Sequence, residues 1–180
     1  MEVKKMKIVI LNGSPRKGNT VTAINALRQG IKAEHEAEVI DTYKLKIGPC
    51  KGCGACGCQN GCVDRDDTNP TIDKLVAADL IVFASPVYWW GITAQMKLVL
   101  DKCYCRGQKL LKKKVGLIIP GGSPIDEEQY RLIKGQFDCI AEYLGWEILF
   151  YEPIYANKKD DLAKDTAELE KLVQLGKAIG

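Results

Sequence analysis

The chain has 180 residues, of which 46% are hydrophobic and 27% are charged, and its formal net charge is +3. This length suits one domain with a full hydrophobic core and is short for two, so we expect a single domain over residues 1–180. The small net charge offers no broad basic surface, which argues against nucleic acid as a partner.

The apolar stretches of the chain are short. The longest, "LIVFASPVYWWGI", is interrupted by a proline and is too short to cross a bilayer. The apolar run near the N-terminus ends at Asn12 and Gly13, before it reaches the length of a signal peptide core. We therefore expect a cytoplasmic protein that does not enter a membrane.

Short apolar runs alternate with helical patterns along the whole chain. Strands are predicted at 7–11, 37–43, 79–84, 114–119 and 146–151. Helices are predicted around 23–31, from about 71, at 93–103, in a long segment after 124 that stops at Gly145, and from about 162 to 179. Parallel neighbours need crossover connections, and these place helices on both faces of a sheet. The pattern thus predicts an α/β fold, a three-layer α/β/α sandwich around a five-stranded parallel sheet.

The unusual residues gather in the loops that follow the first four strands. These loops read "NGSPRKGNT", "CKGCGACGCQNGC", "SPVYWWG" and "PGGSP". In such sheets the carboxyl ends of the strands share one edge, and ligands bind there. We therefore expect the four loops to form a site.

The first of these loops has the composition of a phosphate site. Glycines allow a close backbone approach, hydroxyls donate hydrogen bonds, Arg16 adds a cation, and the start of the next helix offers free N–H groups. The loop matches neither the dinucleotide fingerprint nor the nucleoside triphosphate loop. A mononucleotide phosphate on an exposed loop is favoured over a turn that only caps the helix.

The third loop carries three large rings in a row, Tyr88, Trp89 and Trp90. Consecutive residues of an extended loop cannot all enter one core, so at least one ring should face a ligand or a partner subunit. For each ring taken separately, packing in the core or in an interface remains an alternative to stacking on a ligand.

Two segments together resemble a known family. "GSPRKGNT" and "SPVYWWGITAQMKLVLDK" are similar to the NAD(P)H-dependent FMN reductase family of flavodoxin-like proteins, from about Lys7 to Cys103 and more loosely onward through "PGGSP". The resemblance implies a flavodoxin-like strand order of 2-1-3-4-5, FMN as cofactor, NAD(P)H as co-substrate, and a homodimer or homotetramer. The FMN-binding residues that it implies are Ser14, Arg16, Gly18, Asn19 and Thr20 at the phosphate, Pro86, Val87, Tyr88, Trp89 and Gly91 along the flavin, and Gly121, Gly122 and Ser123 on the far side of the ring system.

The cysteine run at 50–62 predicts a metal site or reactive thiols. Disulfides are disfavoured because a reducing cytoplasm keeps thiols reduced. Cys50, Cys53, Cys56 and Cys62 have C-x2-C-x2-C-x5-C spacing, and Cys58 is an extra thiol. The spacing is similar to that of the iron–sulfur flavoprotein branch of the family, which implies a [4Fe-4S] cluster beside FMN. Redox-active or free thiols and a structural zinc site remain alternatives. Cys62 is preferred to Cys58 as fourth ligand, because a single residue between Cys56 and Cys58 leaves little freedom for both thiols to bind the same metal group.

The other cysteines and the single histidine are expected to be inert. Cys103, Cys105 and Cys139 lie in or near helical patterns and are expected to be buried, whereas His35 in "EHEAE" is expected to be solvated. One histidine provides no Ser-His-Asp relay, so no catalytic side chain is predicted and the chemistry is assigned to a cofactor.

These observations predict an FMN-dependent oxidoreductase. Its electrons would come from NAD(P)H or a ferredoxin-type donor and pass to a small-molecule or protein acceptor. The alternatives are a flavodoxin-like electron carrier and a zinc-stiffened binding module without turnover.

Overall fold

The computed structural model describes residues 5–180 and contains one five-stranded sheet. The strands run in the order β2-β1-β3-β4-β5, and all four neighbouring pairs are parallel. This order confirms the predicted topology. The strands are β1 (Lys7–Asn12), β2 (Glu36–Asp41), β3 (Leu80–Ala84), β4 (Lys114–Gly121) and β5 (Glu147–Tyr155).

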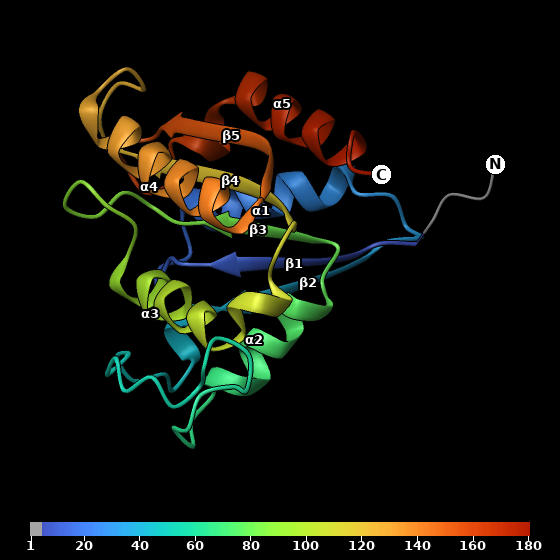
Figure 1. The fold of residues 1–180 in the computed structure, drawn as a ribbon. Helices are drawn as coiled ribbons and strands as arrows, with labels where there is room; N and C mark the ends of the chain where they lie inside the picture. Colours follow the sequence, from blue (N-terminus) through green and yellow to red (C-terminus); the bar gives the residue numbers. More distant parts are fainter. Residues whose placement is uncertain (1–4) are drawn as a thin grey trace.

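Helices cover both faces of the sheet (Figure 1). On one face lie α1 (Asn19–Gly30) and α5 (Thr166–Lys177), and on the other α2 (Thr68–Ala77), α3 (Ala94–Lys102) and α4 (Glu128–Leu144). Short 3-10 turns, η1 (Thr42–Lys44), η2 (Cys103–Lys109) and η3 (Leu162–Lys164), join some of these elements. The three-layer arrangement confirms the predicted fold class.

Successive residues of the central strands pack into two separate hydrophobic cores, one on each face of the sheet. Val9 and Leu11 pack with α2, α3 and α4, whereas Ile8 and Ile10 pack with α1 and α5. Side chains alternate across a strand, so a run that is apolar at every position is buried on both faces. All five residues of β3 are buried in this way.

Three of the element boundaries that differ from the prediction have a clear physical reason. The helix expected from about 71 begins at Thr68, because Pro70 lies in the first turn, where a backbone N–H is not needed. Strand β5 continues through Pro153, which an edge strand tolerates. The last helix does not start at Leu162, because the Asp165 side chain accepts a hydrogen bond from Glu168 N and caps α5 there.

Lys113, in the basic run "KLLKKK" at 109–114, makes a partly buried contact. Lys113 Nζ donates hydrogen bonds to the carbonyl oxygens of Val76 and Ala78, at 2.6 and 2.7 Å. A cation at the C-terminal end of a helix is favoured by the helix dipole. Lys113 therefore stabilises the end of α2.

No helix within residues 5–180 combines the length and the apolar character needed to span a bilayer.

Candidate functional site

A cavity of about 170 Å³ lies at the carboxyl edge of the sheet, between the loops that follow β1, β3, β4 and β5. Most of the residues predicted to bind FMN line it, namely Ser14, Arg16, Gly18, Asn19, Thr20, Pro86, Val87, Tyr88, Gly121 and Gly122. Trp89, Gly91 and Ser123 do not line this cavity. The structure therefore gathers the phosphate loop and part of the aromatic loop around one space.

The phosphate loop is held by its own side chains. Ser14 N donates to Asn12 Oδ1 at 3.0 Å, and Ser14 Oγ accepts from Arg16 N and donates to the Arg16 carbonyl oxygen. Ser14 is buried, whereas Arg16 is exposed. The loop is exposed at Pro15, Arg16 and Lys17, as predicted, but Ser14 itself is buried and its hydroxyl shapes the turn.

The N-terminus of α1 points into this loop without a side-chain cap. Gly18 occupies the capping position and makes no side-chain hydrogen bond there. The N–H groups of a first helical turn have no intrahelical acceptor and carry a partial positive charge. Together with Arg16, this end of α1 has the chemistry of an anion site.

The loop after β5, which is not among the four loops expected to form the site, completes the cavity. Ala156, Asn157, Lys158 and Lys159 line the cavity beside the phosphate loop. Asn19 Nδ2 donates to the carbonyl oxygens of Ala156 and Lys158, at 3.2 and 2.7 Å, so its amide joins the two loops. The sequence does indicate this position, because "YANKKD" follows the fifth strand, whose carboxyl end lies at the same edge of the sheet as those of the other strands.

The loop after β3 forms a tight turn that projects from the molecule (Figure 1). Tyr88 and Gly91 exchange two backbone hydrogen bonds, at 2.8 and 3.0 Å. Trp89 and Trp90 at the tip have φ of 48° and 60°, in the left-handed region that bulky residues rarely adopt. Trp89 is 91% exposed and Trp90 55% exposed, so neither ring enters the core.

The four predicted metal ligands line a second cavity, of about 190 Å³. Cys50, Cys53, Cys56 and Cys62 all border it, together with the buried thiol of Cys105. Cys58 borders another cavity, and a hydrogen bond with Cys58 raises the pKa of Tyr104. The FMN-type cavity and the thiol-lined cavity share no lining residue. The four loops that were expected to form one site therefore border two separate cavities.

The donor chemistry of the second cavity suits a thiophilic metal or an iron–sulfur cluster. Gly52, Gly54 and Gly57 have φ between 51° and 70°, so the loop turns repeatedly around the thiols. Over residues 5–180, however, no three His, Cys, Asp or Glu side chains converge as a ligand group. The thiols therefore border a common space without being drawn together.

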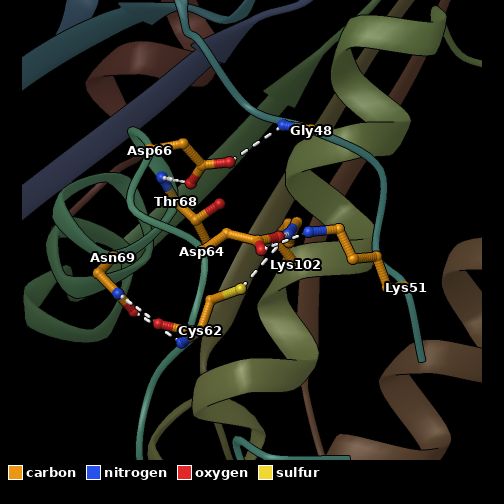
Figure 2. A network of polar contacts seen from close by, with 8 residues as sticks. All are labelled: Gly48, Lys51, Cys62, Asp64, Asp66, Thr68, Asn69 and Lys102. Atoms are coloured by element: carbon orange, nitrogen blue, oxygen red, sulfur yellow. Dashed lines mark hydrogen bonds and ion pairs between the residues drawn. The ribbon is translucent and has the colours of Figure 1, made fainter. Parts of the chain in front are cut away.

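A network of polar contacts fixes the Cys62 side of this cavity (Figure 2). Asn69 accepts from Cys62 N and donates to its carbonyl oxygen, both at 2.8 Å. Lys102 Nζ lies 3.3 Å from Cys62 Sγ and 2.8 Å from Asp64 Oδ2. The other Asp64 oxygen accepts from Lys51 Nζ at 2.7 Å.

The charges in this network reinforce one another. Hydrogen bonds from Lys102 and Lys51 lower the pKa of Asp64 to about 2. Burial acts to lower the pKa of Lys102, but its hydrogen bonds with Asp64 and Cys62 outweigh burial, and the net shift is upward. Lys102 therefore remains a cation although its side chain is only 2% exposed.

Two expectations about isolated residues are wrong. His35 is buried, at 7% exposure, because the turn before β2 places its ring against the start of β1, where Nδ1 accepts a hydrogen bond from Met6 N at 3.3 Å. Cys139 is exposed because it lies on the outer side of α4, whereas Cys103 and Cys105 are buried as expected. Helical periodicity predicted a helix at Cys139, but the prediction placed the thiol on the buried side of that helix and not on its exposed side.

Comparisons with known proteins agree with this fold and site. A family model described as NADPH-dependent FMN reductase matches residues 6–134. An iron-sulfur flavoprotein of Methanosarcina thermophila is 35% identical over 137 residues, which cover 74% of this chain and 72% of that protein. An iron-sulfur flavoprotein of Archaeoglobus fulgidus is 36% identical over 98 residues, and the match covers 54% of this chain and only 48% of the relative. A putative NAD(P)H-dependent FMN-containing oxidoreductase of Bacillus subtilis is 27% identical over 94% of this chain and 96% of its own length.

Solved structures agree with the fold alone. An NAD(P)H:quinone oxidoreductase from Methanothermobacter marburgensis superposes with a TM-score of 0.76 at 16% identity, covering 97% of this chain and 96% of that one. A Trp repressor binding protein from Bacillus subtilis gives a TM-score of 0.68 at 23% identity, covering 93% of this chain and 98% of that one.

Proposed function

This chain belongs to the NADPH-dependent FMN reductase family, and on that premise we propose that it is an oxidoreductase whose FMN occupies the cavity at the carboxyl edge of the sheet. The electrons come from NAD(P)H or a ferredoxin-type donor. One observation carries the assignment: a single cavity combines an uncapped helix N-terminus and three cations with an apolar wall.

The cationic part of the cavity suits the FMN phosphate. Arg16, Lys158 and Lys159 border it beside the first turn of α1. A Cβ atom on Gly18 would lie 3.2 Å from the Lys159 carbonyl oxygen, so the two loops approach each other closely at a glycine. A phosphate there would meet fixed backbone N–H groups and side-chain cations together.

The apolar part suits a planar ring system. Val87 N donates to the Pro120 carbonyl oxygen at 2.9 Å, which fixes the loop after β3 against the end of β4. A Cβ atom on Gly121 would lie 2.6 Å from Tyr130 Oη and 2.8 Å from Val87 Cγ2, so this wall has no room for a side chain. Bound FMN supplies the redox chemistry, and these residues hold and shield it.

Arg16→Ala tests this placement of the phosphate, and Lys17→Ala is its matched control. Both residues are exposed cations of the same loop, but only Arg16 lines the cavity. Loss of a charged hydrogen bond costs about 1.5–3 kcal/mol, so R16A should raise the FMN dissociation constant roughly 10- to 100-fold.

The matched control should remain within about threefold of the wild type, since an exposed charge outside the cavity is screened. Flavin fluorescence titration measures both constants. Equal weakening in the two variants would mean that only the overall charge of the loop matters. Unchanged FMN affinity in both variants would contradict the placement of FMN in this cavity.

We propose further that Cys50, Cys53, Cys56 and Cys62 hold a [4Fe-4S] cluster that transfers single electrons. Support comes from the cavity that all four thiols border and from the relatives named iron-sulfur flavoprotein. Anaerobic purification followed by iron, sulfide and zinc analysis is the test. About four irons per chain are expected, whereas zinc alone, or flavin without any metal, would contradict the cluster.

For the intact protein we propose one domain, a cytoplasmic location and a homodimer or homotetramer. Free thiols suit a reducing compartment, and the exposed rings of Trp89 and Trp90 suit a subunit contact. Light scattering of the wild type and of Trp89→Ser measures the assembly. A monomeric wild type would contradict it, and an unchanged assembly in the variant would place the contact elsewhere.

A further inference from the structure

Lys102 is a buried cation at the edge of the thiol-lined cavity. It is the last residue of α3, its side chain is 2% exposed, and it lines the cavity together with Cys62 and Asp64. Removing an ammonium group from water is costly, and such a group persists only where opposite charge and hydrogen bonds compensate for it. Within residues 5–180, its side-chain partners are Asp64 Oδ2 and Cys62 Sγ.

Asp64 connects this cation with the other end of the cysteine loop. Lys51 directly follows Cys50, and its Nζ binds the Asp64 oxygen that Lys102 leaves free. One carboxylate thus joins the segment beside Cys50, the segment beside Cys62 and helix α3, as Figure 2 shows. We call Lys51, Asp64 and Lys102 the charge clamp.

Neighbouring contacts restrict the direction of the Cys62 side chain. The two hydrogen bonds with Asn69 fix the Cys62 backbone on both sides of its peptide unit. Asp66 accepts from Thr68 N at 2.9 Å and from Gly48 N at 3.1 Å, which holds the two ends of the loop together. With the backbone fixed in this way, Sγ lies 3.3 Å from the ammonium of Lys102, and both residues border the cavity.

We propose that the charge clamp positions the cysteine loop for its metal group, and that Lys102 stabilises the added negative charge when this group is reduced. The inference rests on the proposed cluster function of the cysteine loop. Four thiolates concentrate negative charge in the cavity, and the nearest buried cation offsets it most effectively at low dielectric. Lys102 acts through Cys62 and is a positioning residue.

The sign of a potential shift separates this role from simple support of the loop. Lys102→Met removes a cation, which should make the cluster harder to reduce, whereas Asp64→Asn removes an anion and should make it easier to reduce. We expect at least a tenfold change in the one-electron equilibrium for K102M, about 59 mV downward, and an upward shift for D64N. Lys102→Arg keeps the charge and should restore most of the wild-type potential.

Lys74→Met is the matched control for loss of a lysine ion pair. Lys74 pairs with Glu38 at 2.5 Å, is half exposed and does not border the cavity. K74M should leave the potential unchanged. Potentiometric titration followed by the cluster absorbance measures all four variants, and a shift of the same sign in K102M and D64N would overturn the electrostatic role of Lys102.

Cobalt binding to metal-free protein tests the positioning role without a cluster. Loss of an outer partner of a metal ligand typically lowers metal affinity 10- to 100-fold, so K102M should bind Co²⁺ at least tenfold more weakly than wild type. Equal Co²⁺ affinity together with an unchanged potential would overturn the clamp while leaving the metal site in place. A wild type that binds neither Co²⁺ nor a cluster would overturn the metal site and the clamp together.

Discussion

Cys103 and Cys139 occupy opposite environments, which predicts opposite reactivity. Burial raises the pKa of the Cys103 thiol to about 12, whereas Cys139 is exposed on α4. Because the thiolate is the nucleophile, iodoacetamide at pH 8 should label Cys139 in the native protein and Cys103 only after unfolding. Peptide mass spectrometry after timed labelling measures this, and equal labelling rates in the native protein would contradict the burial of Cys103.

Tyr151 predicts a loss of stability at high pH. Its hydroxyl donates to the Tyr130 carbonyl oxygen at 2.8 Å, and burial raises its pKa to about 12, above the value near 10 of an unfolded tyrosine. The protonated form is therefore favoured by folding. Its contribution is fully present below about pH 10 and is lost as the pH rises from about 10 toward 12.

Tyr151→Phe removes both the hydrogen bond and this titration. At pH 9 the variant should be less stable by about 1 kcal/mol, and its stability should fall less steeply between pH 9 and pH 11. Guanidinium unfolding at the two pH values measures both effects. Parallel pH dependence in wild type and variant would show that Tyr151 titrates equally in both states of the chain.

At the scale of single residues, the sequence identified which side chains have chemical roles better than it predicted whether those side chains are buried or exposed. The thiols, Arg16 and the tryptophans were recognisable by type; Arg16 and the four predicted metal ligands border cavities, whereas Trp89 lies outside the predicted FMN cavity and Cys139 is exposed. Burial of Ser14 and His35 depends on turns whose geometry follows from neighbouring elements. A pattern of residue types carries no record of those turns.

At the scale of elements, the close crossing of α1 and α5 predicts a strong effect of one methyl group. A Cβ atom on Gly176 would fall on the Leu27 carbonyl oxygen and within 2.9 Å of Gly30 Cα. Backbone atoms cannot move aside as a side chain can, so Gly176→Ala should lower the free energy of unfolding by about 1–3 kcal/mol or more.

Gly135→Ala is the control for this crossing. Gly135 lies inside α4, and a Cβ atom there would meet nothing within 4 Å. Helix preference alone should then raise stability by about 1 kcal/mol. Chemical unfolding of both variants compares them directly, and a stabilised G176A would contradict the close packing of the two helices.

The strands were predictable within a few residues because β-branched runs buried on both faces are distinctive. The loop after β5 was missed because the prolonged edge strand, which runs through Pro153, displaced its end by four residues from the expected position. Lys158 and Lys159, which border the cavity, therefore fell outside the four loops that were expected to form the site.

At the scale of the whole molecule, the cavity predicts that the phosphate group contributes to thermal stability. A ligand that binds only the folded chain at 100 times its dissociation constant adds about 2.7 kcal/mol to the free energy of unfolding. FMN should therefore raise the melting temperature more than riboflavin, which lacks the phosphate, at the same concentration.

The same comparison in R16A should reduce the difference between the two flavins, since Arg16 is one of the three cations that border the cavity. Differential scanning fluorimetry with wild type, R16A and K17A measures it. An equal rise with riboflavin and FMN in the wild type would mean that the cations of the cavity do not hold the phosphate.

The fold as a whole followed from the alternation of elements, but the division of its chemistry between two cavities did not. The cysteine run leaves β2 at the carboxyl edge, yet its cavity is completed by the far end of α3 and by η2. The length of the run allows this displacement, and spacing within the run contains no information about where the loop is anchored.

The anchoring of the cysteine run also determines what a change in its length would cost. Asp67 N donates to the Lys46 carbonyl oxygen at 3.1 Å, and Lys46 N donates to Asp67 Oδ2 at 2.7 Å, so the loop leaves and rejoins the body at one point. Doubling the length of a flexible loop adds only about 0.6 kcal/mol of closure entropy. A longer or shorter segment between these two residues would therefore cost little closure entropy, and its main cost would be the loss of the contacts that Asn69 and the buried Lys102 make with Cys62 and Asp64.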